Sequence, residues 1–322
     1  MSTTTHTPST SQNTDRSRFL ASWKSPSIEL QRLLALILLI GQGGITVTGS
    51  LVRVTGSGLG CDTWPLCHEG SLVPVAGAAP WIHQAIEFGN RLLTFVLTAA
   101  AAAVLVAVIR AGRRREVRWL AIASIAGIVV QAIIGGISVR VDLRWWAVAA
   151  HFLPSMVLVW IAALLYMRIA ETDAAQPQRR FAPPARTLAV LAAVALSLVL
   201  VTGTMVTGSG PHSGDAAAGM QGRLQMDTRL LVYIHAACMY LYLFSTAATA
   251  YVLRRSHAPK DAFNTSLVLI GALVVQWAVG VTQFYLGVPR WTVPFHIAMS
   301  SVVVAFCAFL WAHGRRRMPT VV

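Results

Sequence analysis

Charged side chains are scarce in this chain of 322 residues, at 12% of the sequence. About a quarter of the residues in a soluble domain are charged, so the composition excludes an ordinary soluble protein. Acidic residues are the scarcest, with 12 Asp and Glu against 26 Lys and Arg. The sequence also lacks the short segments of alternating apolar and polar residues that build a transmembrane β-barrel, which excludes that class.

Cysteine is rare as well, with four residues in the whole chain. Cys61 and Cys67 stand together in the segment CDTWPLC. Their spacing is too wide for a zinc knuckle, which has two residues between its cysteines. The charge pattern below puts this segment outside the cytoplasm, where two nearby thiols are expected to form a disulfide. A structural disulfide and one that exchanges electrons with a thiol carrier both stay open.

Long hydrophobic runs fill most of the sequence. Hydrophobic residues make up 55% of the chain, and they gather in runs of roughly 20 residues, the length that crosses a bilayer as a helix. We therefore predict an all-α polytopic membrane protein with eight transmembrane helices. The predicted spans are residues 30–49, 86–109, 118–138, 146–167, 187–207, 230–252, 264–286 and 291–312.

Basic residues distinguish the two sides of the membrane. Most of the 26 Lys and Arg lie in the tails and in alternate loops, such as RAGRRREVR at 110–118. Loops of this kind stay in the cytoplasm, so both termini are predicted to be cytoplasmic and the protein to lie in the plasma membrane. The same distribution argues against binding of nucleic acid as the reason for the net charge of +14. The outer side keeps Arg53, Arg91, Arg140, Arg144, Arg223, Arg229 and Arg290.

The two halves of the sequence resemble each other. VVQAIIGG at 129–136 resembles VVQWAVGV at 274–281, and AAHFLPSMVLV resembles PFHIAMSSVVV. Earlier in each half, VTGSLVRVTGSG at 47–58 resembles VTGTMVTGSG at 201–210. Each unit holds an even number of spans, so the two units have the same orientation. We predict two tandem four-helix bundles related by a pseudo-twofold axis along the membrane normal.

The repeat also suggests domain boundaries. The Ser/Thr-rich start of the chain is polar and is expected to be a disordered cytoplasmic tail. The first hydrophobic run is too long for the core of a signal peptide and is expected to stay as an anchor, although a mitochondrial presequence is left open. The predicted parts are the tail 1–27, the first unit 28–168, a cytoplasmic linker 169–186, the second unit 187–313 and a cytoplasmic tail 314–322.

Histidine and asparagine occupy corresponding places near the outer ends of the even-numbered spans. His151 and His296 are 145 residues apart, as are Asn90 and His235. A single buried histidine is usually a packing residue, but three at repeat-related positions favour ligation. Histidines at one depth on facing helices can clamp a flat metal macrocycle, so we predict that His235 and His296 bind a haem iron. The outer arginines, Arg91 above all, are expected to meet the haem propionates, with solvated loop charge as the alternative.

Glu87 is the one acidic residue that falls within a predicted span, and it is therefore a functional candidate. It lies about one turn before Asn90 and on the same helix face. Its carboxylate could relay protons or stabilise positive charge at a reacting carbon, and an ion pair with Arg91 is the structural alternative. His83 shares this face. His68 adjoins the cysteine pair and is expected to be solvated.

Several motifs together resemble those of the haem A synthase family. They are TGSLVRVTGSGLGCDTWPLC, IEFGNR, AAHFLPS, TGSGPHSGD, YIHAA and PFHIAMS, which spread over about residues 30–312. The cysteine segment with the RVTGSGLGC that leads into it is the most specific of them. A high content of Ala and Arg hints at a bacterial member.

The resemblance implies an activity and a set of sites. The family oxidises a ring methyl group of haem O to a formyl group, by two successive hydroxylations and loss of water, and so supplies haem A to terminal oxidases. Its haem b falls here on His235 and His296, and its substrate site on His151. The family's catalytic carboxylate matches Glu87, and its outer-loop disulfide matches the CDTWPLC segment.

Asn90 departs from the family pattern, because many members have histidine at this position. An asparagine amide is a poor iron ligand, so the substrate iron is held by His151 alone or with His83 reaching it from one side. An open coordination position would suit binding of oxygen. The residues expected at the substrate are His151, Asn90, Arg91 and His83.

The resulting interpretation is an asymmetric use of two similar halves, with electron transfer in the second and chemistry in the first. A membrane b-type cytochrome that only transfers electrons is the first alternative, and Asn90 breaks the equivalence of sites that it requires. A transporter is the second, but no span offers an ionisable residue deep in its cytoplasmic half.

The expected partners follow from the resemblance and from the hydrophobic composition. They are the lipid bilayer, haem O synthase (the protohaem farnesyltransferase) as substrate donor, and an unidentified electron donor. Molecular oxygen and water are both candidates for the source of oxygen. A homo-oligomer is left open, and no nucleic acid is expected.

Overall fold

The computed structural model describes residues 25–213 and 222–318. In this part of the chain, eight helices are long and apolar enough to cross a membrane, one for each predicted span. The all-α polytopic class is thus confirmed, whereas most of the predicted tail 1–27 lies outside the described residues. The helices are α2 (Ile28–Val54), α3 (Trp81–Arg110), α4 (Arg115–Arg140), α5 (Trp145–Ile169), α6 (Pro183–Ser209), α7 (Thr228–Arg255), α8 (Lys260–Leu286) and α9 (Thr292–His313).

Polar side chains cap two of the helices just outside the hydrophobic runs. The hydroxyl of Ser27 accepts a hydrogen bond from the backbone N–H of Leu30 at 3.2 Å and caps α2. Asp227 caps α7 through its carboxylate in the same way. Gly287 ends α8 with a φ of +68°, a left-handed conformation that glycine adopts at no steric cost. Because a run of apolar residues does not include its caps, it underestimates the length of a helix.

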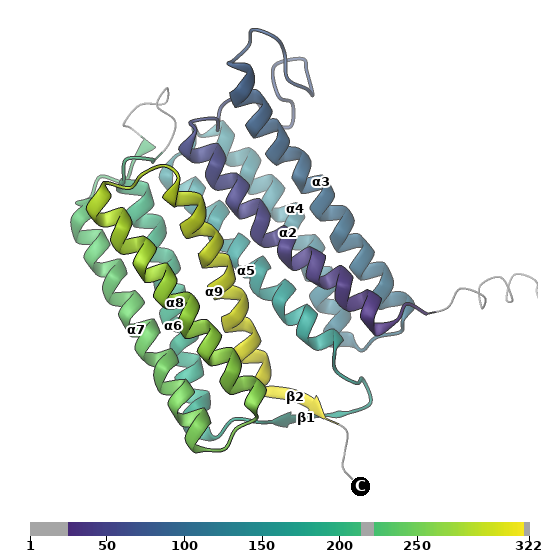
Figure 1. The fold of residues 1–322 in the computed structure, drawn as a ribbon. Helices are drawn as coiled ribbons and strands as arrows, with labels where there is room; N and C mark the ends of the chain where they lie inside the picture. Colours follow the sequence, from purple (N-terminus) through teal and green to yellow (C-terminus); the bar gives the residue numbers. More distant parts are fainter. Residues whose placement is uncertain (1–24, 214–221, 319–322) are drawn as a thin grey trace, which may run out of the picture.

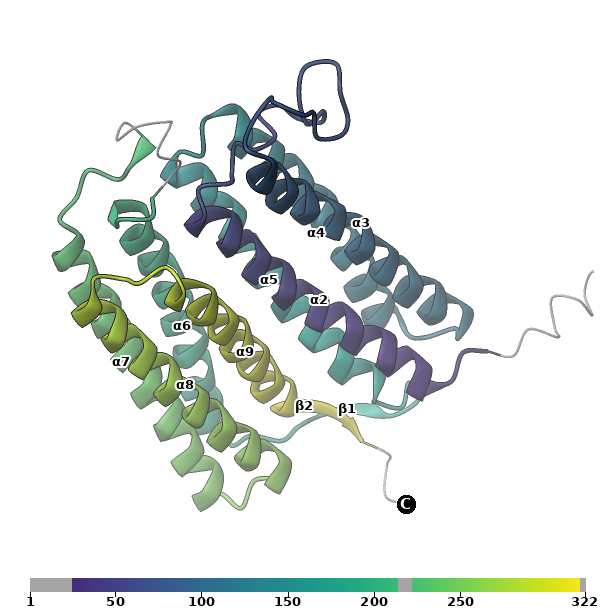
Figure 2. The same ribbon diagram turned by 45° about the horizontal axis from the view of Figure 1, so that its top comes forward.

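The helices form two bundles of four (Figures 1 and 2). In the first bundle, α2 to α5 each contact the next helix and α2 closes the ring against α5, which leaves α3 diagonally across from α5. In the second bundle, α6 to α9 follow the same order, but α6 packs closely on α7 and scarcely approaches α9. The bundles meet where α9 packs on α2 and α5. The pseudo-twofold axis and the domain boundaries stay predictions.

The loops gather at two ends of the molecule (Figure 1). What we call the cysteine-loop end carries residues 55–80 between α2 and α3 and residues 287–291 between α8 and α9. What we call the arginine-rich end carries residues 111–114 and 170–182. Helices α3, α5, α7 and α9 all begin at the cysteine-loop end.

Ion pairs organise the arginine-rich end. The Arg113 guanidinium is buried and donates to the backbone carbonyls of Ile169 and Glu171, both at 2.9 Å. Arg113 and Arg114 also pair with the Asp173 carboxylate at 2.9 and 2.8 Å. Partial burial acts to raise the pKa of Asp173, but hydrogen bonds from the two arginines outweigh it and hold this pKa below its ordinary value. The network ties the segment after α5 to the turn between α3 and α4.

A two-stranded antiparallel sheet lies at the same end. β1 (Gln176–Arg179) pairs with β2 (Arg315–Met318), so the segment between the bundles is tied to the segment that follows α9. The sequence pattern predicts only helices, because neither four-residue strand shows the alternation by which a strand is recognised. The linker and the C-terminal segment are therefore not independent of each other.

Small and hydroxylated residues join the two bundles. The hydroxyls of Thr46 on α2 and Ser301 on α9 are buried and 3.0 Å apart. A Cβ at Gly43 would lie 3.4 Å from the Cβ of Ser301, so the two helices approach closely there. Small residues and interhelical hydrogen bonds of this kind hold helices together in a membrane.

Candidate functional site

Four positions that correspond in the repeat lie within the first three turns of their helices. Asn90, His151, His235 and His296 belong to α3, α5, α7 and α9. At 1.5 Å per residue, they lie roughly 6 to 14 Å along the helix axis from the cysteine-loop end. The repeat therefore brings all four residues to the same side of the membrane-spanning region.

In the second bundle, His235 and His296 lie on the diagonal helices α7 and α9. The Nδ1 of His235 is 3.1 Å from the hydroxyl oxygen of Thr202. That hydroxyl donates its own proton to the backbone carbonyl of Leu198 at 2.7 Å, so it accepts the Nδ1–H of the imidazole. The Nε2 of His235 then carries a lone pair. A Cβ at Gly203 would lie 3.2 Å from the Cε1 of this ring, so glycine makes room for it.

The backbone carbonyl of His296 accepts hydrogen bonds from two side chains. Gln276 on α8 donates through its Nε2 at 3.1 Å, and the Ser300 hydroxyl donates at 2.9 Å. The same Nε2 lies 2.9 Å from the Ser300 hydroxyl, to which it also donates. Gly280 lies one turn after Gln276, and a Cβ there would lie 3.7 Å from the Cε1 of His296.

The first bundle repeats this arrangement around His151. Gln131 on α4 donates to the backbone carbonyl of His151 at 2.8 Å and to the hydroxyl of Ser155. Ser155 donates to the same carbonyl at 2.9 Å. A Cβ at Gly135 would lie 3.2 Å from the Cε1 of His151. His151 and His296 therefore occupy equivalent niches, each made of a glutamine, a serine and a glycine.

The bundles differ at Asn90. Thr48 donates a hydrogen bond to the Asn90 Oδ1 at 2.7 Å, in the place where the corresponding threonine of α6 bonds a histidine. A Cβ at Gly49 would meet no heavy atom within 4 Å, whereas the corresponding glycine of α6 lies against an imidazole. The first bundle thus keeps the support of the site but has a short amide where the second bundle has an imidazole.

Four buried polar atoms beside the histidines have no hydrogen-bond partner among the described residues. They are the Nδ1 atoms of His151 and His296 and the Oε1 atoms of Gln131 and Gln276. Buried polar atoms without a partner are rare, and these four match across the repeat. The two glutamines were not among the residues predicted for the site, although their spacing of 145 residues is a signal that could have identified them.

The loop between α2 and α3 folds back on the start of α3. The predicted disulfide between Cys61 and Cys67 is present, and both cysteines are buried. The prediction of a solvated His68 is wrong, because its Nδ1 lies 2.9 Å from the Asp62 carboxylate and its Nε2 lies 2.9 Å from the Gln84 Oε1. The side chain of His68 is buried since the closed loop presses it against α3.

Glu87 is buried beneath this loop. Its Oε2 accepts the backbone N–H of Cys61 at 2.8 Å, and its Oε1 pairs with Arg91 at 2.6 Å. Arg91 also donates to the backbone carbonyls of Cys61, Thr63 and Leu66 at 2.9, 3.0 and 3.0 Å. The ion pair considered as the structural alternative for Glu87 is therefore present. The roles of Glu87 and Arg91 toward a substrate stay predictions.

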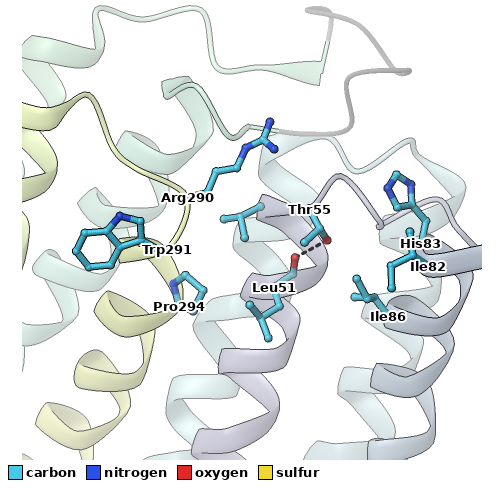
Figure 3. A pocket seen from close by; sticks show the side chains of 9 residues that line it. Leu51, Thr55, Ile82, His83, Ile86, Arg290, Trp291 and Pro294 are labelled. Carbon is cyan, nitrogen blue, oxygen red and sulfur yellow. Dashed lines mark hydrogen bonds between the residues drawn. The ribbon is translucent and has the colours of Figure 1, made fainter. Parts of the chain in front are cut away.

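His83 lines a pocket of about 400 Å³ at the cysteine-loop end (Figure 3). The pocket lies between the end of α2 and the starts of α3 and α9, so both bundles contribute to it. Its walls are mostly apolar, with Leu51 and Ile86 among them and Arg290 at the α9 side. His83 makes no side-chain hydrogen bond to another described residue, and its contact with a substrate stays a prediction.

Other arginines at this end bind loop carbonyls. Arg53 donates to the carbonyl of His212 at 2.6 Å, and Arg140 donates to that of Trp64 at 2.8 Å. These contacts brace the loops over the helix ends. Binding of propionates by the outer arginines stays a prediction.

Comparisons with known proteins identify a family and relatives. A family model described as cytochrome oxidase assembly protein, COX15-CtaA, matches residues 32–308. A heme A synthase of Bacillus licheniformis is 31% identical over 153 residues, which cover 46% of this chain and 48% of that protein. One of Shouchella clausii is 33% identical over 155 residues, 47% of this chain and 48% of that protein. The chain thus spans about half the length of the relatives it matches.

Proposed function

The chain belongs to the COX15-CtaA family of cytochrome oxidase assembly proteins, and we propose that it is a haem A synthase. It oxidises a ring methyl group of haem O to a formyl group by successive hydroxylations, and haem A then serves terminal oxidases. One observation carries the proposal. The histidine niche is built twice with the same supporting residues, and Asn90 replaces a histidine in the first bundle only.

The residues of the second bundle fit a permanently bound haem b with His235 and His296 as axial ligands. Thr202 accepts the Nδ1–H of His235, which leaves Nε2 to bind iron. Gly203 and Gly280 leave room for the two rings. The unpaired Nδ1 of His296 also fits a ring that is engaged through its other nitrogen. When bound, this haem supplies a redox-active iron.

The residues of the first bundle fit haem O as substrate. His151 offers one imidazole, and its niche matches that of His296. On the opposite helix, the oxygen of Asn90 is already bonded by Thr48, and Gly49 has space beside it. One face of the substrate ring therefore meets no strong protein ligand. This inequality disfavours a cytochrome that only transfers electrons, since such a protein needs two equivalent sites.

Glu87 acts on protons or on positive charge that develops at the reacting carbon. It lies about one turn before Asn90 on α3, so the two share a helix face. The backbone N–H of Cys61 and the Arg91 guanidinium fix the direction of its carboxylate. We assign Arg91 and His83 to the same substrate region, at the end of the bundle where the haem propionates would lie.

We place the cysteine-loop end outside the cytoplasm and both termini inside it, in a bacterial plasma membrane. The concentration of arginine at the opposite end supports this orientation. A disulfide in the loop agrees with an oxidising compartment. Haem O synthase delivers the substrate, a donor still to be identified supplies electrons, and molecular oxygen or water supplies the oxygen atom.

The test is expression in cells that make haem O but have no haem A synthase of their own, followed by extraction of the pigments. The wild-type chain should yield haem A. Glu87→Ala should yield none, while His257→Asn, at the opposite end of the molecule, should behave as the wild type. Recovery of haem O alone from cells that contain the folded wild-type protein would contradict the proposal.

A further inference from the structure

In each bundle a hydrogen bond joins two neighbouring helices at the backbone of the histidine. We call Gln131 with Ser155, and Gln276 with Ser300, the two glutamine braces. In each brace the glutamine reaches from one helix to the next and donates to the histidine carbonyl, while the serine donates to the same carbonyl from one turn further along. The two braces are equivalent in residue type, in spacing and in bonding.

A brace of this kind controls the place of the imidazole. A side chain on a helix moves as a body with the backbone when the helix turns or slides. Fixing the carbonyl of the histidine itself, rather than one elsewhere on the helix, fixes the Cα from which the ring projects. Ligand geometry must hold within about 0.5 Å for a site to work. A hydrogen bond to the histidine backbone therefore limits the displacement of the ligand itself.

The second bundle contains a tether that offers a comparison. Gln283 also reaches from α8 to α9, where it donates to the Thr292 hydroxyl at 3.0 Å. It therefore joins the same two helices as Gln276, but its described hydrogen bond goes to Thr292 and not to His296. A simple need to hold α8 against α9 is already met by this bond.

The side-chain oxygen of each brace glutamine also indicates why a glutamine stands there. The Oε1 atoms of Gln131 and Gln276 are buried and have no partner among the described residues. Leaving a buried acceptor unpaired destabilises the folded protein. A leucine would avoid that cost and still pack between helices, yet both bundles use glutamine. The amide N–H groups are thus the part of the side chain that the site requires.

We propose that Gln131 and Gln276 are positioning residues that orient the imidazoles of His151 and His296 toward haem iron. The inference rests on the proposed function, because it takes the two histidines to be ligands. It adds residues that are not ligands themselves but determine how each ligand presents its Nε2. The brace of the second bundle acts on haem b, and that of the first acts on the substrate.

The test uses purified protein with haem b bound. We would record its visible spectrum and its low-spin electron paramagnetic resonance signal. That signal reports the orientation of axial imidazoles. Gln276→Leu should shift that signal and weaken retention of haem by about tenfold, the low end of the range for lost outer-shell partners. Ser300→Ala should shift the signal less. Gln283→Leu, the matched tether, and Gln131→Leu, the brace of the other bundle, should leave it as in the wild type.

The outcomes separate the two proposals. Absence of haem from the wild-type protein contradicts the haem sites, and the inference falls with them. Haem in the wild type with unchanged signals in both Gln276→Leu and Ser300→Ala overturns the inference alone. Equal shifts in Gln276→Leu and Gln283→Leu overturn it too, because they reduce the brace to ordinary helix packing. If Gln276→Leu does not accumulate, the comparison of Ser300→Ala with Gln283→Leu decides.

Discussion

In the second bundle a histidine on α7 stands diagonally across from a histidine on α9, whereas in the first bundle α3 offers Asn90 to the histidine of α5. The support around these positions is the same in both, with a threonine and a glycine on one side and a glutamine, a serine and a glycine on the other. The two bundles therefore share a frame and differ at one position, where the first has an amide and the second an imidazole. A difference in chemistry between the bundles must arise from the few residues that do not match.

Those residues cluster on α3 and in the loop before it. At the offset of 145 residues, Glu87 corresponds to Val232 and Arg91 to Ala236. Among the described residues, the second bundle thus has no ion pair at this place, and Val232 stands where the first bundle has its buried acid. The first bundle couples its buried acid to a disulfide-closed loop through the N–H of Cys61. We therefore propose that the second bundle holds a haem firmly and that the first places a buried acid beside its substrate.

The largest expected effects come from two single variants, each of which removes one histidine from one bundle. His296→Ala should abolish the haem b spectrum of the purified protein, because an alanine leaves the iron with one protein ligand at most. His151→Ala should leave that spectrum intact but abolish formation of haem A. Absorption spectra and pigment extraction measure the two results. Identical losses of haem b in both variants would show that the bundles are not specialised.

Asn90→His makes the first bundle resemble the second. The Thr48 hydroxyl and the space beside Gly49 suit an imidazole as their counterparts on α6 do, so the new ring should bind iron. We expect a second low-spin haem signal and no gain in haem A formation, since the substrate iron would gain a ligand on its free face. Asn90→Ala is the control, because it should add no such signal. Higher activity in Asn90→His would refute the role given to the asparagine.

Opening the disulfide should affect the first bundle alone. Cys61→Ser removes a cross-link of the kind worth about 2–4 kcal/mol and loosens the loop that orients Glu87. We expect a lower melting temperature and a fall in haem A formation, with the haem b spectrum unchanged. The double variant with Cys67→Ser should equal the single one, because both remove the same bond. A changed haem b spectrum would show that the loop serves both bundles.

Much of this fold could be predicted from the sequence, for a physical reason. A bilayer demands long apolar runs, so each span has an unmistakable pattern and all eight predicted spans correspond to helices of the described chain. The short strands β1 and β2 have no such pattern, since four residues bonded mainly through their backbones leave no periodic trace. The caps Ser27 and Asp227 were missed for another reason, because polar residues lie outside the apolar runs.

The site was predictable only in part. The histidines stand out because an imidazole in an apolar run is costly. The sequence repeat alone is enough to show which of them correspond. The burial of His68 was not predictable, because it depends on Asp62 and on Gln84, a residue in the next helix whose approach requires the folded loop. The backbone N–H of Cys61 bonds Glu87, and the backbone carbonyls of Cys61, Thr63 and Leu66 bond its partner Arg91. A backbone group has no signature in a sequence.

The smallest effect should come from the two threonines that support the α3 and α7 positions. Thr202→Val keeps the shape of the side chain but removes the acceptor of the His235 Nδ1–H. Haem b affinity should fall by about tenfold, and the reduction potential should change, because the imidazole loses the bond that fixes its tautomer. Thr48→Val removes a bond to Asn90 and should leave haem b unaffected, while it alters only the use of haem O. Titration of haem into the two apo-proteins measures the difference. Equal affinities would mean that the threonines only pack the helices and do not affect the ligand. The chemistry of the two bundles would then differ only through positions where the residue types differ, such as Asn90.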